Sequence, residues 1–198
     1  MGAAPHQRGS ASFLKTRIME QVTINKQAKL SEHLASPSEA TFGQTSKLDG
    51  SHLSPHFTLG ELTKTSAKTP DGNIPSHVHI ENLKRLCRWL EMLRSHWNMM
   101  YGEGNDPLII NSGYRSPQVN KAVGGVATSN HLTGCAADIR VSGQEQLIRY
   151  AAILLDISDE THEDFDELLL ERSPRGTYWL HFAVRPKDNR RKIRFIQT

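Results

Sequence analysis

Residues 129–138 read Ser-Asn-His-Leu-Thr-Gly-Cys-Ala-Ala-Asp, and this stretch decides how the rest of the chain is interpreted. It places His131 in an expected loop and Asp138 seven residues later on an expected strand. Residues 134–137 between them are small, which lets backbone segments approach closely, as the floor of a tight site requires. Far downstream, His181 follows Trp179-Leu180 on another expected strand. Two His and one Asp supply nitrogen and oxygen ligands and leave a fourth position open, the arrangement of a catalytic zinc site.

Each of these residues also has an ordinary structural explanation. A histidine on a strand is more often a packed or surface side chain than a metal ligand. Asp138 is able instead to cap a turn or to pair with Arg115 or Arg140. Cys135 is conceivable as a thiolate ligand, although a cysteine beside a strand is more commonly a small buried side chain. The spacing alone therefore leaves both explanations open and names no reaction.

The composition limits the kind of metal site and the class of protein. The 198 residues contain ten His and two Cys, which excludes a disulfide framework and a Cys-rich zinc finger. No stretch approaches the roughly 18 apolar residues of a membrane span, and residues 1–20 lack the apolar core of a signal peptide. A formal net charge of +3 is weak evidence for a polyanionic partner. We therefore expect nitrogen and oxygen ligation, no membrane insertion and no specific nucleic-acid partner.

The chain divides into two parts of different character. Residues 1–54 are rich in Ser, Gln, Lys, Thr, Ala and His, which predicts a flexible, disordered N-terminal arm. Residues 55–198 carry regular apolar patterns and are expected to form one domain. Within that domain, the basic segment 185–192 is interpreted as a solvated loop.

Hydrophobic periodicity predicts an α+β fold, with a small antiparallel sheet packed against helices. Apolar residues at three- and four-residue steps predict a helix over about 76–97. A shorter helix is expected to begin at Ser116-Pro117, and a third to follow a capping box formed by Ser142 and Glu145. The expected strands are residues 107–111, 136–141, 165–171, 177–184 and 193–197, and the third and fourth of these form a hairpin.

The pattern Ser129-x-His131-x-x-Gly134-x-Ala136-x-Asp138 resembles the zinc motif of the M15 zinc metallopeptidases. These are the D-alanyl-D-alanine carboxypeptidase-like peptidases of peptidoglycan. Residues 110–116 resemble the family's substrate-side segment, 120–125 the link to the zinc motif, and 179–181 the surroundings of the third ligand. Residues 57–62 resemble the entry segment of its phage and bacterial branch. The resemblance covers about residues 54–184 and implies a fold like that of hedgehog and the D-Ala-D-Ala peptidases.

The resemblance implies Zn²⁺ bound by His131, Asp138 and His181, and hydrolysis of peptide bonds in cell-wall peptides. It also implies that Arg115 reaches the substrate, where a guanidinium holds a carboxylate or polarises a carbonyl oxygen. A surface arginine or one paired with an Asp is the alternative for Arg115. The other residues expected to bind substrate are Ser129, Tyr114 and Trp179.

The general base is the least certain part of the expected site. Many relatives carry an acid three residues before the last histidine, and here that position is Tyr178. Glu171 is expected to be the base because the predicted hairpin lays it beside residues 178–181. Strand alternation places Glu171 and Glu167 on one face. Asp166 and Glu167 are the reserve candidates, and all three acids have the alternative of ordinary solvated strand charges.

These observations predict a zinc metallopeptidase that acts on peptidoglycan stem peptides or cross-links. The reaction is that of a D,D- or L,D-type carboxypeptidase or endopeptidase, for example a phage endolysin. The alternatives on the same fold are a non-catalytic, zinc-containing module that binds the cell wall and a virion-associated structural protein. We expect a monomer that stays in the cytoplasm until lysis releases it, or a phage-associated protein, with the cell wall as its target.

Overall fold

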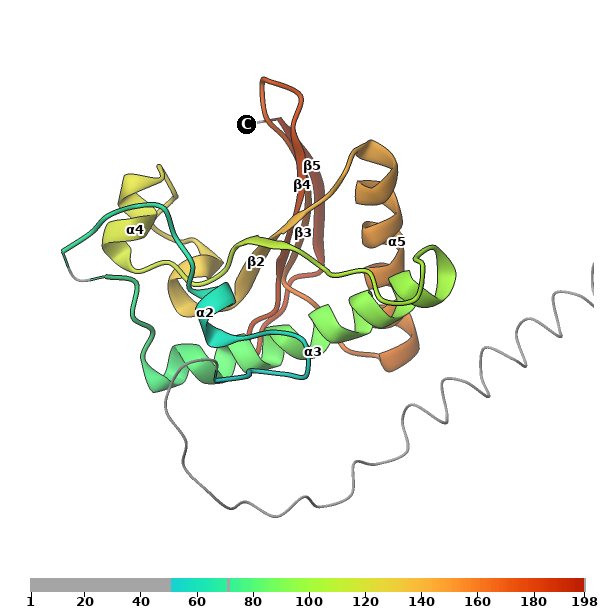
Figure 1. Ribbon diagram of the computed structural model, residues 1–198, viewed down its shortest axis with the longest axis horizontal. Coiled ribbons are helices and arrows are strands. Elements are labelled where there is room, and N and C mark those ends of the chain that lie inside the picture. Colours follow the sequence, from blue (N-terminus) through green and yellow to red (C-terminus); the bar gives the residue numbers. More distant parts are fainter. Residues whose placement is uncertain (1–50, 71, 198) are drawn as a thin grey trace, which may run out of the picture. The chain divides into compact units, whose positions relative to one another are not determined.

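The computed structural model describes residues 51–70 and 72–197, whose course Figure 1 shows. Residues 1–50 of the expected arm lie outside the described residues. The last part of that arm contacts the domain, because Leu53 N donates to Phe57 O at 2.8 Å and Ser54 Oγ donates to Glu91 at 2.6 Å. Contacts with the domain therefore begin earlier than the boundary expected at residue 55.

The long helix α3 (His77–Met100) forms around a stripe of apolar residues. Its first turn is closed by the His79 ring, whose Nδ1 accepts from Ser76 N at 3.2 Å. Four leucines recur at three- and four-residue steps and are 0% exposed: Leu83, Leu86, Leu90 and Leu93. The helix expected over 76–97 is therefore confirmed, with an end three residues further along the chain.

Two further helices show how local caps form. Helix α4 (Pro117–Ala122) begins as predicted, with Ser116 Oγ accepting from Val119 N at 3.3 Å. Helix α5 (Gln144–Thr161) does not use the predicted capping box. Its N-cap is Gly143, and Ser142 N donates instead to Gln146 Oε1 at 2.6 Å. A glutamine side chain reaching back from the first turn therefore replaces the expected Ser142–Glu145 pair.

Five strands form one sheet in the order β1 (Ile110–Ser112), β2 (Ala136–Arg140), β4 (Tyr178–Ala183), β3 (Glu167–Arg172) and β5 (Lys192–Gln197). The pairs β1–β2, β2–β4 and β3–β4 are antiparallel and include the predicted hairpin. Strand β5 pairs parallel to β3, so the expectation of a wholly antiparallel sheet is wrong at this edge. The link 184–191 crosses the start of β3, where Arg191 N donates to Phe165 O, and β5 then runs alongside β3. The α+β class is confirmed.

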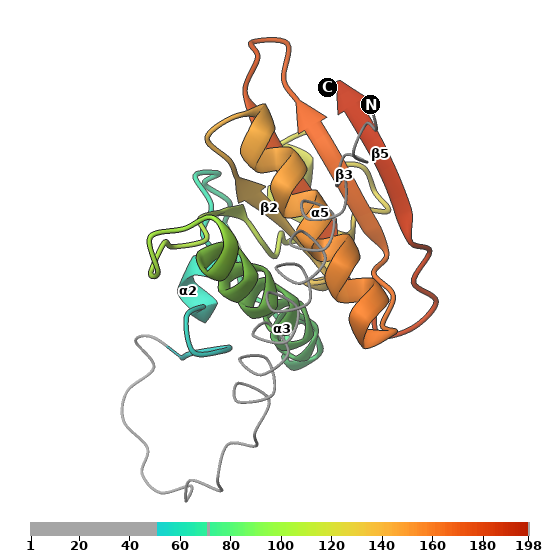
Figure 2. The ribbon, with the colours of Figure 1, turned by 90° about the vertical axis from the view of Figure 1, so that its right-hand side faces the viewer.

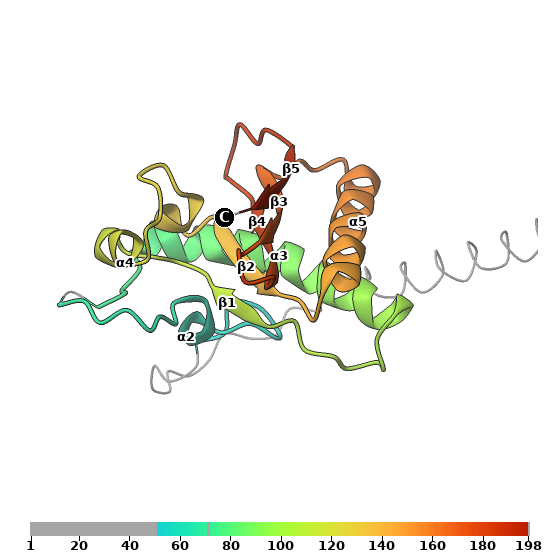
Figure 3. The ribbon, with the colours of Figure 1, turned by 90° about the horizontal axis from the view of Figure 1, so that it is seen from above.

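The two faces of the sheet differ in chemistry. Helices α3 and α5 pack on one face, over a core that includes Ile139, Leu168, Leu180 and Phe182 (Figure 2). Burying one such side chain stabilises the fold by about 1.5–3 kcal/mol. Figure 3 shows α4 on the opposite side of the sheet from α5. No helix within residues 51–70 and 72–197 has the length and apolar character needed to span a membrane.

Candidate metal centre

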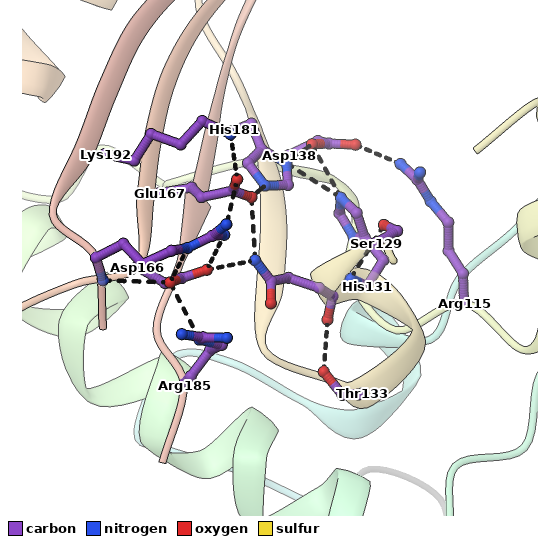
Figure 4. A network of polar contacts seen from close by, with 12 residues as sticks. Arg115, Ser129, His131, Thr133, Asp138, Asp166, Glu167, His181, Arg185 and Lys192 are labelled. Atoms are coloured by element: carbon purple, nitrogen blue, oxygen red, sulfur yellow. Dashed lines mark hydrogen bonds and ion pairs between the residues drawn. The ribbon is translucent and has the colours of Figure 1, made fainter. Parts of the chain in front are cut away.

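Three residues from separate elements meet on the polar face of the sheet (Figure 4). Asp138 of β2 lies directly opposite His181 of β4 in the antiparallel register, which points both side chains to the same face. His131 comes from the short 3₁₀ helix η1 (Asn130–Thr133), which leads into β2. The helix ends at Gly134 with φ of 71°, and a Cβ there would lie 2.7 Å from His79 O. The small residue that the motif places at this position therefore lets η1 sit against α3, as the sequence predicts.

The three candidate ligand atoms form a compact triangle. Asp138 Oδ1 lies 3.2 Å from His131 Nε2 and 2.9 Å from His181 Nδ1, and the two nitrogens are 3.2 Å apart. Ligands at about 2.0–2.1 Å from a tetrahedral zinc ion lie about 3.3 Å from one another. The donor set and its spacing therefore fit a metal ion with three protein ligands and one open position. The structure brings together the three residues that the sequence predicts as ligands.

A backbone carbonyl sets the ring orientation of His131. His131 Nδ1 donates to Gly113 O at 2.6 Å, which leaves the lone pair of Nε2 facing the triangle. A second partner of this kind fixes the tautomer of a metal-binding histidine. Gly113 is packed tightly, since a Cβ on it would lie 2.3 Å from Leu62 O. The approach of the short helix α2 (Leu59–Leu62) to β1 therefore positions the carbonyl that orients His131.

The charges around the triangle favour a cation. Burial opposes protonation of His181, but the carboxylates of Asp138 and Glu167 outweigh it and raise the pKa of His181 to about 9. Burial also disfavours ionisation of Asp138, yet the two histidines hold the pKa of its carboxyl far below the usual range. The pKa of His131 is lowered, mainly by burial, so this ring favours the neutral form that binds metals. The groups that attract a proton to this site also attract a divalent metal ion.

Arg115 lies beside the triangle and not in it. Its Nη2 pairs with Asp138 Oδ2, and its Nε donates to Ser112 Oγ at 2.8 Å. Its backbone N donates to His131 O at 3.1 Å. Of the two roles considered for Arg115 from the sequence, the pairing with an Asp is present, and the arginine is held at the edge of the candidate centre.

Glu171 shares the face of the candidate ligands. Glu171 lies opposite Trp179 on β4. Trp179 and His181 are two residues apart and so share a face of the sheet, which places the Glu171 side chain on that face as well. Burial raises the pKa of Glu171, and the charges of His181, Asp138 and Arg115 also act on it. A half-buried carboxyl on the same sheet face as the triangle has the character of a proton acceptor.

The two reserve acids have other partners. Asp166 is 0% exposed and pairs with Arg190 at 2.7 Å and Arg185 at 3.0 Å. Glu167 faces His181 Nε2 at 3.6 Å and receives a hydrogen bond from Lys192 at 2.8 Å. Both reserve acids are therefore held by charged partners, and Glu171 stays the base that the sequence predicts. These contacts also show that residues 185–191 form the predicted loop, whereas Lys192 begins β5, and that Arg190 and Lys192 both pair with Glu167 on the polar face.

The residues expected to bind substrate occupy different places. Ser129 Oγ caps η1 by accepting from His131 N at 3.3 Å. Tyr114 is 4% exposed and stacks on His79, with its ring in the core and not on the surface. Trp179 is partly exposed on the face that carries His181 and Glu171. Cys135 is buried, and its Sγ lies near Thr133 O at 3.8 Å, outside the triangle.

Sequence reasoning missed three contributors to this region. The Gly113 carbonyl has no side chain that could signal its role. Asn130 donates to Glu167 at 3.0 Å, and its position inside the motif at residues 129–138 was the available signal. Arg190 pairs with Glu167 at 3.0 Å from a segment interpreted as a solvated loop. Partners this distant in sequence become visible only once β5 is known to lie beside β3.

Comparison with known proteins identifies one family. The sequence model of the peptidase M15 family matches residues 55–159. The match contains Arg115, His131 and Asp138 and ends before β3, so it contains neither Glu171 nor His181. The chain is also similar to the zinc D-Ala-D-Ala carboxypeptidase of Streptomyces albus G, with 28% identity over 106 residues. The aligned part is 53% of this chain and 39% of that relative, so the chain spans well under half of the relative's length.

Proposed function

Because the chain belongs to the M15 family of peptidases, we propose that it hydrolyses peptide bonds in peptidoglycan stem peptides or cross-links with zinc as its cofactor. The observation that carries the proposal is the triangle formed by His131, Asp138 and His181 on the same face as Glu171. The printed name of the Streptomyces relative supports D-alanine-containing peptides as the substrate class.

The residues of the site divide the chemistry between them. When bound, zinc supplies Lewis-acid chemistry that polarises a peptide carbonyl and makes water more acidic. Glu171 takes the proton of the attacking water and passes it to the leaving amine, a transfer worth about 10²–10⁴-fold in rate. Burial brings the pKa of Glu171 nearer to neutral pH, which favours both halves of this transfer.

Arg115 is proposed to contact the substrate through Nη1 of its guanidinium. Within the described residues Nε contacts Ser112 and Nη2 contacts Asp138, and no partner of Nη1 is found there, so Nη1 is proposed to donate to a peptide carbonyl or a terminal carboxylate. Trp179 offers an apolar surface on the same face. A carboxypeptidase would use this donor for the terminal carboxylate and an endopeptidase for an internal carbonyl. Both reactions stay within the proposal, as does a role as a phage endolysin that reaches the wall at lysis.

A second candidate function is a non-catalytic zinc module that binds the cell wall. The observation that favours it is Tyr178, which stands where many relatives have an acid three residues before the third ligand. A virion-associated structural role would depend on residues 1–50, which lie outside the described residues.

A pair of matched variants tests the catalytic proposal. Glu171→Gln should lower kcat by about 10²–10⁴-fold, and zinc content should stay unchanged because Glu171 is not one of the proposed ligands. Glu103→Gln is the control, since Glu103 is exposed and lies in the loop between α3 and β1. New amines released from purified peptidoglycan are the measurement. Full activity of Glu171→Gln would remove Glu171 as the base, and a zinc-loaded wild type that binds wall fragments without turnover would favour the binding module.

A further inference from the structure

One ring nitrogen of the candidate ligand His181 faces a carboxylate that the proposed mechanism does not use. His181 Nδ1 points into the triangle, 2.9 Å from Asp138 Oδ1. His181 Nε2 points the other way, is buried and has no hydrogen-bond partner among the described residues. The group opposite it is Glu167 Oε2, at 3.6 Å, slightly beyond hydrogen-bond length. Figure 4 shows Glu167 between His181 and Lys192.

Glu167 is held in place by three donors. Lys192 Nζ donates to Oε1 at 2.8 Å, and Arg190 Nη2 lies 3.0 Å from the same oxygen. Asn130 Nδ2 donates to Oε2 at 3.0 Å. The Glu167 side chain is only 13% exposed, so its charge is compensated by these groups more than by water. A carboxylate with this many partners is built to stay in one orientation.

The donors to Glu167 are themselves anchored by Asp166. The Arg190 side chain makes two contacts with Asp166, at 2.8 Å from Nε and 2.7 Å from Nη2, and its backbone N donates to Asp166 Oδ1 at 3.3 Å. Asn130 Nδ2 also donates to Asp166 Oδ2 at 2.8 Å. Asn130 directly precedes His131, so the same network touches the elements that carry two of the three candidate ligands. The C-terminal link and β5 therefore connect to the candidate metal centre through Glu167.

We propose that Glu167 is a positioning residue that orients His181 as a metal ligand, and that Arg190 and Lys192 of the C-terminal segment hold Glu167 in that role. A carboxylate opposite the second ring nitrogen fixes which nitrogen carries the proton and makes the ligating nitrogen more basic. Glu167 thereby has a different role from Glu171, which lies on the same strand face and carries the proton transfer. The inference rests on the proposed zinc site, and it extends that site beyond the residues that the family match covers.

The test uses zinc affinity, which a role in proton transfer alone would not change. Glu167→Gln keeps the side-chain shape and removes the charge. The zinc dissociation constant, measured by competition with a chelating dye, should rise by about 10- to 100-fold. The visible absorption spectrum of the cobalt-substituted protein should change as well, because the donor strength of His181 changes. Glu167→Asp should recover part of the affinity.

Two further variants keep the test decisive if Glu167→Gln does not fold. Lys192→Met and Arg190→Met each remove one partner of Glu167 from a partly exposed position. Each should weaken zinc binding in the same direction, and the double variant more than either. The matched control is Arg194→Met, because Arg194 is exposed on β5 with Lys192 and its side chain makes no ion pair or hydrogen bond within the described residues.

An unchanged zinc dissociation constant and cobalt spectrum in Glu167→Gln, or in the Lys192→Met and Arg190→Met double variant, would overturn the inference. Turnover of peptidoglycan by the wild type, measured alongside, distinguishes this failure from failure of the proposed function. An active wild type with zinc affinity independent of Glu167 refutes the positioning role alone. A wild type that binds no zinc refutes both.

Discussion

Adding a single methyl group at Gly113 should disturb the metal centre without touching a ligand. The Cβ of Gly113→Ala would lie 2.3 Å from Leu62 O and 3.0 Å from Leu62 Cα. These are backbone atoms, so no side chain is able to rotate away. Restoring ordinary contact requires α2 and β1 to separate by about 1 Å, and overpacking of this kind costs about 1–3 kcal/mol. The separation also strains the hydrogen bond of 2.7 Å from Tyr114 N to Leu62 O.

The same shift moves the carbonyl that orients His131. Gly113 O accepts from His131 Nδ1 at 2.6 Å, so displacing the Gly113 backbone turns the ring or breaks this bond. Loss of such a partner weakens metal binding by about 10- to 100-fold. Urea unfolding of the zinc-free protein should give the stability loss, and competition with a chelating dye should give the loss of affinity.

Gly60→Ala is the matched control for this change. Gly60 lies in α2, and no heavy atom lies within 4 Å of a Cβ built on it. The substitution should leave zinc affinity unchanged and stabilise the protein slightly, by up to about 1 kcal/mol, because alanine favours helix over glycine. The reasoning is refuted if Gly113→Ala binds zinc as tightly as Gly60→Ala and unfolds at the same urea concentration.

Two other predictions concern pH and metal removal. Burial disfavours ionisation of Asp166, but hydrogen bonds from Arg190 and Asn130 outweigh this effect and lower the pKa of the Asp166 carboxyl. The ionised carboxyl therefore stabilises the fold fully above the unfolded pKa of about 3.9, and this stabilisation is lost as pH falls through the folded pKa. Asp166→Asn should therefore lower the free energy of unfolding by about 2–4 kcal/mol at pH 7, less than the loss of a fully buried pair, because Arg190 is half exposed. The difference from wild type, measured by urea unfolding of zinc-free protein, should shrink below pH 4. A difference that stays constant with pH would show that the charge of Asp166 does not stabilise the fold. A chelator should abolish hydrolysis but leave a cooperative thermal transition, because the apolar core lies on the opposite face of the sheet from the candidate ligands. Zinc at about 1,000 times its dissociation constant should add about 4 kcal/mol to stability, and loss of the cooperative transition on chelation would mean that the metal holds the fold together.

Local patterns predicted much of this structure for identifiable physical reasons. The stripe of leucines in α3 and the apolar runs of β3 and β4 depend only on neighbouring residues, and these three elements form within a few residues of the expected bounds. The motif at residues 129–138 has its ligands on elements that are adjacent in sequence, so His131 and Asp138 could be placed together. His181 joined them only through the register of β2 with β4 and the resemblance to a family.

The remaining features depend on contacts that periodicity does not encode. Alternation shows which face of β5 a residue occupies but not which strand lies beside it, so the parallel pairing with β3 was not foreseen. Glu167 and Glu171 share a face of β3, so alternation alone gives them the same role. Their contacts distinguish Glu167, the proposed positioning residue, from Glu171, the candidate base. The Gly113 carbonyl is a backbone group whose role follows from the packing of Leu62.

His131, Asp138 and His181 are proposed to hold a zinc ion that serves hydrolysis of peptidoglycan peptides. Mass spectrometry of muropeptides, after incubation with zinc-loaded protein, chelated protein and chelated protein restored with zinc, tests it most directly. New stem-peptide fragments are expected with the first and third samples and none with the second. Intact muropeptides in all three, with zinc confirmed in the first and third, would contradict the proposal.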